Sequence, residues 1–290
     1  MIPLAYITQW RQISPWPDDT QVEQDLILSR IIVEIFSDLF LRKELAFRGG
    51  TALNKLFFKP AARYSEDIDL VRTGSGSIKP IIDRLHDCLN AWLGEPRTER
   101  TKNNFKLKYS FSPENSSKLK QNIKIEINTR EIFSVYDRTI EKFSIKSSWF
   151  TGEAEVNTYQ FEELIATKLR ALYQRRKGRD LFDLWLALQV QGINLQKVIQ
   201  AFQGYMKKER NVISRTMFEK NIDLKLKDSK FTNDIEALLS PKFKQRQSKI
   251  LTTQNRFQLA AENGVILMTQ GWSLEYAAEE LKVKLLRYLV

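Results

Sequence analysis

The sequence Ser65-Glu-Asp-Ile-Asp-Leu70 places two aspartates one residue apart between apolar residues. Side chains on a β-strand alternate between its two faces, so Asp67 and Asp69 point one way while Ile68 and Leu70 point into the core. Two carboxylates on one face repel each other unless a positive charge lies between them. Hard divalent cations such as Mg²⁺ take oxygen ligands and bridge carboxylates to substrate phosphates. The stretch therefore predicts a strand that binds metal ions.

A turn of two glycines and a threonine, Gly49-Gly50-Thr51, precedes this strand and opens an apolar run that is typical of a helix start. Amide groups at helix N-termini form anion sites, so the turn is a candidate phosphate cradle. Arg63 and Ser65 lie just upstream of the aspartates, where they would contact a triphosphate or hold the aspartates in place. Taken singly, a Gly-Gly pair is usually a plain turn, and Asp-x-Asp is frequent on solvated strand edges. Their order along the chain favours nucleotidyl transfer.

Alternating apolar and polar residues predict two further strands, over residues 105–111 and 123–128, separated by a loop over residues 112–117. Glu126 lies on the polar face of the second strand. There it would supply a third carboxylate to the metal site or act as a base, and a surface glutamate is the alternative. The spacing of apolar residues also predicts helices over residues 20–46 and 81–93.

From about residue 155 to its end, the chain is predicted to be helical. Apolar residues from Phe161 to Leu172 recur with the helical period, and Lys168 falls inside their stripe. Burying an ammonium group without a partner is costly. We therefore predict that Lys168 enters the cleft, binds the triphosphate and is dispensable for stability. A lysine stem that reaches out to water is the alternative.

Gly178 is predicted to end this helix and Asp180 to begin the next, with Asp183 one turn further on. Aspartate is a common residue at helix starts, so a purely structural ion-pair role is one interpretation of both acids. The other is that they orient the neighbouring cations toward phosphate, since the turn is strongly basic: Arg175, Arg176, Lys177 and Arg179. A short amphipathic helix over residues 231–239, containing Asp234, is predicted after it.

The composition indicates one large domain or two modest ones with a real core, because 42% of the 290 residues are hydrophobic. A single cysteine, Cys88, permits no intrachain disulfide and fits a reducing compartment. A single histidine argues against a zinc site built from His and Cys. Neither a signal peptide nor a membrane-spanning stretch is recognisable. These features predict a soluble, cytoplasmic protein with no membrane partner.

The net charge of +11, from 46 basic and 35 acidic residues, suggests a polyanionic partner. Much of the excess lies in the C-terminal half, where a solvated helical surface is the alternative for any single lysine. As a cluster near a nucleotidyl-transfer site, these residues favour RNA binding: Lys207, Lys208, Arg210, Arg215, Lys220, Lys225, Lys227 and Lys230, followed by Lys242, Lys244, Arg246 and Lys249.

Two long motifs support a family assignment. The stretch Phe47-Arg-Gly-Gly-Thr-Ala-Leu-Asn-Lys55, followed by Arg63-Tyr-Ser-Glu-Asp-Ile-Asp-Leu70, resembles the first motif of the AbiEii/AbiGii toxin family of nucleotidyltransferases, within the DNA polymerase beta-like superfamily. The block over residues 168–185 resembles the third motif, a lysine and arginines followed by Arg-Asp-x-x-Asp. Glu126 resembles the acidic residue of the brief second motif, and Asp234 the family's final aspartate. The resemblance covers most of the chain.

This resemblance implies an α+β fold: a polymerase beta-like nucleotidyltransferase core, with a mixed sheet and flanking helices, followed by a mainly helical C-terminal region. We expect the two domains to occupy residues 1–152 and 153–290. The implied protein is a toxin of a toxin–antitoxin or phage-defence system, controlled by a cognate antitoxin. It would transfer nucleotides from an NTP to an RNA acceptor, such as the 3′ end of a tRNA.

The expected cofactor is Mg²⁺, as two ions, with Mn²⁺ as a possible substitute. Asp67, Asp69 and Glu126 would bind the metal, and Lys168 would neutralise the leaving pyrophosphate. The expected nucleotide-binding residues are Gly49, Gly50, Thr51, Arg63, Ser65, Arg175, Asp180 and Asp183. The alternatives are nucleotidyl transfer to a protein or small molecule, and a nucleic-acid-binding module without activity.

Overall fold

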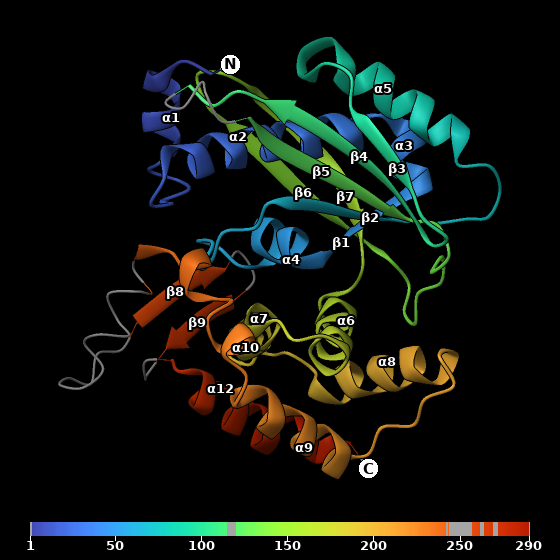
Figure 1. The fold of residues 1–290 in the computed structure, drawn as a ribbon, viewed down its shortest axis with the longest axis vertical. Coiled ribbons are helices and arrows are strands. Elements are labelled where there is room, and N and C mark those ends of the chain that lie inside the picture. Colours follow the sequence, from blue (N-terminus) through green and yellow to red (C-terminus); the bar gives the residue numbers. More distant parts are fainter. Residues whose placement is uncertain are drawn as a thin grey trace. The chain divides into compact units, whose positions relative to one another are not determined.

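The computed structural model divides into two compact units, residues 1–159 and 160–290. It describes residues 2–114, 120–241, 243, 257–261, 264–268 and 272–289. The first unit is built on a mixed sheet with flanking helices and the second is mainly helical, which confirms the predicted α+β class (Figure 1). The predicted domain boundary after residue 152 falls within a strand of the first unit, β7 (Thr151–Thr158).

The first unit contains the elements that carry the Gly-Gly-Thr turn and the Asp67–Asp69 strand. They are α1 (Leu4–Trp10), α2 (Asp19–Ser37), α3 (Leu39–Glu44), β1 (Leu45–Arg48), α4 (Gly49–Ala52), the π-helix η1 (Leu53–Phe57), β2 (Asp67–Arg72), α5 (Lys79–Leu93), β3 (Arg97–Arg100), β4 (Asn104–Phe111), β5 (Gln121–Asn128), β6 (Thr139–Lys146) and β7.

The seven strands form one sheet in the order β3-β4-β5-β2-β1-β7-β6. Strands β2 and β5 are parallel, as are β1 and β7, and the other neighbours are antiparallel. The short strand β1 lies next to the central strand β2 and joins it to β7. Both predicted strands on either side of the 112–117 loop are present as β4 and β5, although residues 115–117 of that loop lie outside the described part of the chain.

One face of the sheet is covered by helices. Helix α2 packs on β7 and against α5, and Figure 1 shows it passing behind the strands. The apolar residues of β4 and β5 point to this side: Leu107 and Ile125 are fully buried, and the Tyr109 hydroxyl donates to Asn90 Oδ1 of α5 over 3.0 Å. The polar residues of these strands therefore lie on the opposite face, as their alternation predicts.

The helix predicted over residues 20–46 is interrupted at Asp38 and ends at Glu44. Asp38 has an extended backbone, and its carboxylate accepts the Leu41 N–H over 2.8 Å, which caps a new helix, α3. The following residues form β1 and not a continuation of the helix. A short apolar run fits a buried strand as well as a helix, and Leu45, Ala46 and Phe47 are fully buried.

The second unit comprises five helices of seven or more residues, several short helical turns and a hairpin, among the residues that the structure describes. They are α6 (Phe161–Gln174), α7 (Gly178–Ala187), α8 (Leu195–Lys208), α9 (Arg215–Leu226), α10 (Ser229–Thr232), the 3₁₀ turn η2 (Glu236–Leu238), β8 (Phe257–Ala261), β9 (Gly264–Met268), α12 (Leu274–Glu280), η3 (Leu281–Leu285) and η4 (Leu286–Tyr288).

Three predictions for the C-terminal half need correction. The chain is not helical throughout, because β7 extends to Thr158 and β8 pairs with β9. Gly178 does not end a helix: α6 ends at Gln174, and Gly178 is the first residue of α7, where a Cβ would lie 3.5 Å from the carbonyl carbon of Phe231. The helix predicted over residues 231–239 is divided into α10 and η2.

No helix within the described ranges has both the length and the apolar character that crossing a lipid bilayer requires.

Candidate active site

The Gly-Gly-Thr turn joins β1 to α4 and packs on the Asp69 side chain. Gly49 has a φ of +85°, a conformation that residues with a Cβ rarely adopt. A Cβ at this position would also lie 2.9 Å from Cβ and Cγ of Asp69. Both the backbone conformation and the close approach therefore require glycine, and the turn directly positions one of the two predicted metal ligands.

Gly49→Ala is expected to impair nucleotide transfer by displacing the Asp69 carboxylate. The left-handed backbone adds about 1–2 kcal/mol of strain, and a displacement of about 1 Å at a reacting centre costs about a hundredfold in rate. Initial rates with a labelled NTP measure the effect. Gly74→Ala is the matched control, because nothing lies within 4 Å of a Cβ there. Equal rates for both variants would contradict the positioning role of Gly49.

The rest of the turn is tied to the beginning of β2. The Thr51 and Ser65 hydroxyls are 2.8 Å apart, and Thr51 also donates to the Asp67 carbonyl. The guanidinium of Arg63 lies against Gly50 and donates to the Tyr64 carbonyl over 2.9 Å. Arg63 is only 2% exposed, so its position fits the predicted role of holding the aspartates in place. These five residues, predicted as nucleotide-binding, lie together.

The strand register brings the three predicted carboxylates onto one face of the sheet. Ile68 and Leu70 are buried, as the alternation predicts, while Asp67 and Asp69 are partly exposed. In the parallel pairing of β2 with β5, Asp69 lies directly opposite Glu126. Like charges at such positions destabilise a sheet unless a cation compensates them.

Two lysines that the sequence analysis did not assign to the site supply this compensation. Lys124 Nζ lies 2.9 Å from Asp67 Oδ2 and 3.5 Å from Glu126 Oε2, and Lys106 Nζ lies 3.3 Å from Glu126 Oε2. Burial alone would lower the pKa of Lys124, but the hydrogen bond to Asp67 and the charges of the neighbouring acids outweigh it and raise that pKa. Lys124 is therefore charged at neutral pH. The polar face of β5 was visible in the sequence, but the pairing with β2 was not.

The donor set fits a hard divalent cation. Asp67 and Asp69 offer carboxylate oxygens on one strand face, which is how Mg²⁺ is held when it bridges protein to substrate phosphates. Within the described residues, no three acidic, histidine or cysteine side chains converge closely enough to hold a metal by themselves. Glu126 instead accepts from Asn104 over 2.7 Å and pairs with the two lysines.

In the second unit, the four residues predicted from the Lys168–Trp185 block form one network, in which Lys168, Asp180 and Asp183 are buried and Arg175 is exposed. Lys168 Nζ lies 3.3 Å from Asp180 Oδ1 and 2.9 Å from Asp183 Oδ2, and Lys168 is 5% exposed. Arg175 donates twice to Asp180, over 2.6 and 2.8 Å. Burial would raise the pKa of Asp180, but the charges of Lys168 and Arg175 outweigh it and lower that pKa. Because Lys168 is buried and paired with two acids, its surroundings favour a contribution to stability, in contrast to the expectation that it is dispensable.

The predicted basic cluster is mostly on the surface, with one exception. Lys207, Lys208 and Arg210 are exposed, as are Arg215, Lys220, Lys227 and Lys230. Lys225 is 5% exposed and donates to the carbonyls of Leu172 and Tyr173, at the end of α6. Burial lowers its pKa to about 8. Lys225 therefore stabilises a helix end and does not belong to a binding surface. Lys242, Lys244, Arg246 and Lys249 lie outside the described residues.

Asp234 also lies in a basic setting. Its carboxylate accepts from Lys177 Nζ over 3.1 Å and from the Arg179 backbone N–H over 3.3 Å. Asp234 thus fixes the start of α7 at Lys177 and Arg179, which flank Gly178 and precede Asp180 of the Lys168 network.

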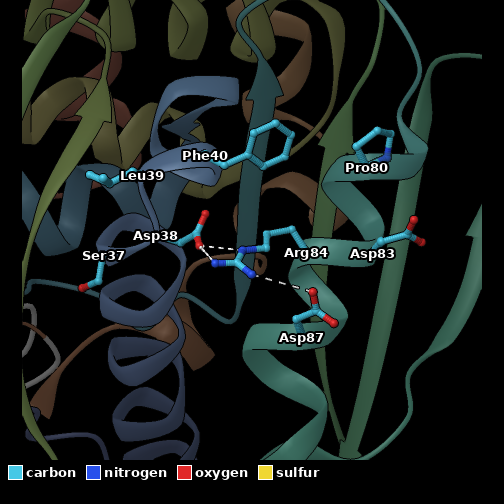
Figure 2. Close-up of a pocket in the computed structure, with 8 residues that line it drawn as sticks. All are labelled: Ser37, Asp38, Leu39, Phe40, Pro80, Asp83, Arg84 and Asp87. Carbon is cyan, nitrogen blue, oxygen red and sulfur yellow. Dashed lines mark hydrogen bonds and ion pairs between the residues drawn. The ribbon is translucent and has the colours of Figure 1, made fainter.

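A groove of about 630 Å³ in the first unit contains none of the predicted residues. It lies where α3 and α5 begin, and Figure 2 shows Arg84 between Asp38 and Asp87, with Leu39, Phe40 and Pro80 beside them. Arg84 pairs with Asp38 over 2.6 Å and with Asp87 over 3.8 Å. Because its lining comes from helices and contains no strand residue, the groove is separate from the carboxylate face of the sheet, which is the candidate active site.

Comparisons with known proteins identify the family and the fold. The family model described as nucleotidyl transferase AbiEii toxin, Type IV TA system, matches residues 30–277. MenT4, a nucleotidyltransferase toxin from Mycobacterium tuberculosis H37Rv, superposes with a TM-score of 0.59 at 15% identity, covering 83% of this chain and 84% of that one. JHP933 from Helicobacter pylori gives a TM-score of 0.45 at 17% identity over 93% and 92% of the two chains. A comparison with curated proteins finds no match. The likeness to MenT4 confirms the fold.

Proposed function

This chain belongs to the AbiEii family of nucleotidyl transferase toxins from type IV toxin–antitoxin systems, and from that premise we propose that it transfers nucleotides from an NTP to RNA at a metal site on Asp67 and Asp69. Nucleotidyl transfer, an NTP substrate and an antitoxin partner follow from the family. The acceptor and the metal are the proposal. The observation that carries it is the pair of partly exposed aspartates on one face of β2, against the Gly49 turn.

Asp67 and Asp69 would hold the metal, Mg²⁺ or Mn²⁺, and Glu126 would complete the site or act as the base. When bound, such cations lower the pKa of the acceptor hydroxyl and neutralise the charge of the leaving pyrophosphate. Thr51 donates to the Asp67 carbonyl and so ties the turn to β2, while Ser65 and Arg63 hold the segment just before this strand. The amides of Gly49, Gly50 and Thr51 would bind phosphate oxygens at the start of α4.

Lys168 and Arg175 would bind the triphosphate, with Asp180 and Asp183 orienting both cations. Buried ion pairs are seldom worth their desolvation cost as stabilising devices, so a lysine at 5% exposure between two acids supports a functional role. The Arg175 side chain is half exposed while it pairs with Asp180, so its guanidinium has room to reach a phosphate group.

RNA is the favoured acceptor because the chain carries a net charge of +11. A cationic small molecule such as an aminoglycoside needs an acidic pocket, and the exposed lysines of α8 and α9 offer the opposite charge. A tRNA 3′ end is the specific acceptor that we propose. Transfer to a protein is the second candidate.

Incubation of the purified chain with each labelled NTP, Mg²⁺ and total cellular RNA tests the proposal. We expect label in a discrete RNA band of tRNA size, for one or a few NTPs. Chelation with EDTA should abolish labelling, and Mg²⁺ or Mn²⁺ should restore it. If the label appears in a protein band and none appears in RNA, the proposal that RNA is the acceptor is overturned. If labelling persists in EDTA, the proposed metal site is overturned.

A further inference from the structure

A row of three cations crosses strands β3, β4 and β5 and ends at Asp67. Arg97 lies opposite Lys108, Lys108 opposite Lys124, and Lys124 opposite Asp67. Residues directly opposite each other in a sheet share a face, so the side chains of Arg97, Lys108, Lys124 and Asp67 all lie on the same face of the sheet. Neighbouring strands are about 4.8 Å apart. Because β3 is the edge strand and Asp67 lies on β2, the row extends from the edge of the sheet to the candidate metal site.

This row opposes local stability. Like charges directly opposite each other destabilise a sheet, and here two such pairs follow one another. The compensation is partial: Lys108 pairs with Glu99 over 2.5 Å, at a site where both side chains are substantially exposed, and exposed pairs contribute little. Local arrangements that break a stability rule are expected at functional sites.

The side chains of the three cations are partly or fully exposed, and the strands that carry them are anchored by buried neighbours. Arg97 is exposed, and the side chains of Lys108 and Lys124 are 35% and 29% exposed. Their neighbours along the strands, Leu107 and Ile125, are fully buried on the other face. The strand register therefore fixes the stems of these lysines, while their ammonium groups, although paired with Glu99 and Asp67, are partly open to solvent.

We propose that this row, Arg97, Lys108 and Lys124, binds the phosphodiester backbone of the RNA acceptor next to its reacting end. The inference rests on the proposed function, since it assumes a metal site at Asp67 and Asp69 and an RNA acceptor. Charge complementarity supports it: contacts to phosphates position a nucleic acid without reading its sequence, and lysines bind phosphate as point charges. Divalent cations at the aspartates would replace Lys124 as counter-charge, which leaves its ammonium free to bind phosphate.

The variant Arg97→Gln/Lys108→Gln tests the row without touching the carboxylates. Arg100→Gln is the matched control: it removes a cation from the same exposed strand, but Arg100 lies opposite Phe105, on the other face of the sheet. Fluorescence anisotropy of unfractionated, end-labelled tRNA gives affinity at a series of salt concentrations. Losing two phosphate contacts should reduce the slope of log K against log[salt] by about 1.4–1.8, and Arg100→Gln should leave the slope unchanged.

A third variant, Lys207→Gln/Lys208→Gln, tests the exposed lysines at the end of α8. If the slope falls only in this variant, the RNA backbone lies on the helical unit and the row on the sheet is not its binding site. A wild-type slope in Arg97→Gln/Lys108→Gln, whose thermal melt should show no loss of stability because opposed cations are removed, overturns the inference in the same way. In either case the proposed function stands if wild-type protein still labels RNA. Protein labelling without RNA labelling would overturn both.

Discussion

Asp69→Asn is expected to abolish nucleotide transfer while the fold survives. The substitution keeps the size of a side chain that packs against Gly49, but it removes the charge that a divalent cation requires. Metal-ion catalysis contributes several kcal/mol to the stabilisation of the transition state, so the loss in rate should be about a thousandfold or more. Initial rates with a labelled NTP and RNA measure it. Retention of a tenth of the wild-type turnover would contradict the assignment.

The same variant should have a stability close to that of the wild type. Asp69 lies opposite Glu126 on one side and opposite Arg48 on the other, so removing its charge relieves one repulsion and loses one attraction. Glu66→Gln is the matched control, since Glu66 is exposed and adjacent to Asp67 in sequence. It makes the same change of charge and should leave both the rate and the melting temperature unchanged. Direct Mn²⁺ binding, measured by electron paramagnetic resonance, should be lost in Asp69→Asn and retained in Glu66→Gln.

Lys168→Met is expected to destabilise the helical unit strongly. It leaves Asp183, which is fully buried, lacking an ammonium that lies 2.9 Å away in the wild type. Removing one partner of a buried ion pair costs about 3–5 kcal/mol. Chemical denaturation followed by circular dichroism measures the change in the free energy of unfolding. A loss below about 1 kcal/mol, the range of exposed pairs, would show that the pair is not buried in solution.

The double variant Lys168→Met/Asp183→Asn separates stability from catalysis. The amide that replaces the Asp183 carboxylate carries no charge, so much of the lost stability should return, while Asp180 keeps its two hydrogen bonds from Arg175. If Lys168 also binds the triphosphate, transfer stays impaired in the double variant although its fold is restored. Recovery of both stability and transfer would remove Lys168 from the catalytic residues and leave it a structural role.

The local geometry around Asp67 and Asp69 could be predicted because it depends only on neighbouring residues in the sequence. The strand period alone places Asp67 and Asp69 on one face and Ile68 in the core, and φ at Gly49 explains why its turn contains glycine. The role of Lys124 could not be predicted in this way. It depends on the parallel pairing of β2 with β5, and no pattern within either strand specifies which residue of one lies beside which residue of the other.

The helical spacing of the sequence distinguishes Lys225 from the other lysines of the basic cluster. Phe218 and Ile222, seven and three residues before it, are fully buried on α9, so helical spacing places Lys225 on the buried face. A count of charges along the chain treats every lysine alike, whereas the helical period distinguishes this one. Lys168 was correctly seen as lying in an apolar stripe, but its partners come from α7, and only the packing of two helices brings them together.

Asp38 makes the segment that leads into the active site sensitive to length more than to composition. Its carboxylate fixes where α3 begins, and α3 leads into β1, which pairs with the central strand β2 so that Arg48 lies opposite Asp69. Leu39 is 70% exposed, so substitutions there should be tolerated. Inserting or deleting one residue between Asp38 and Leu45 would instead turn every β1 side chain to the other face. Evolutionary drift in this segment should therefore proceed by replacement and avoid gaps.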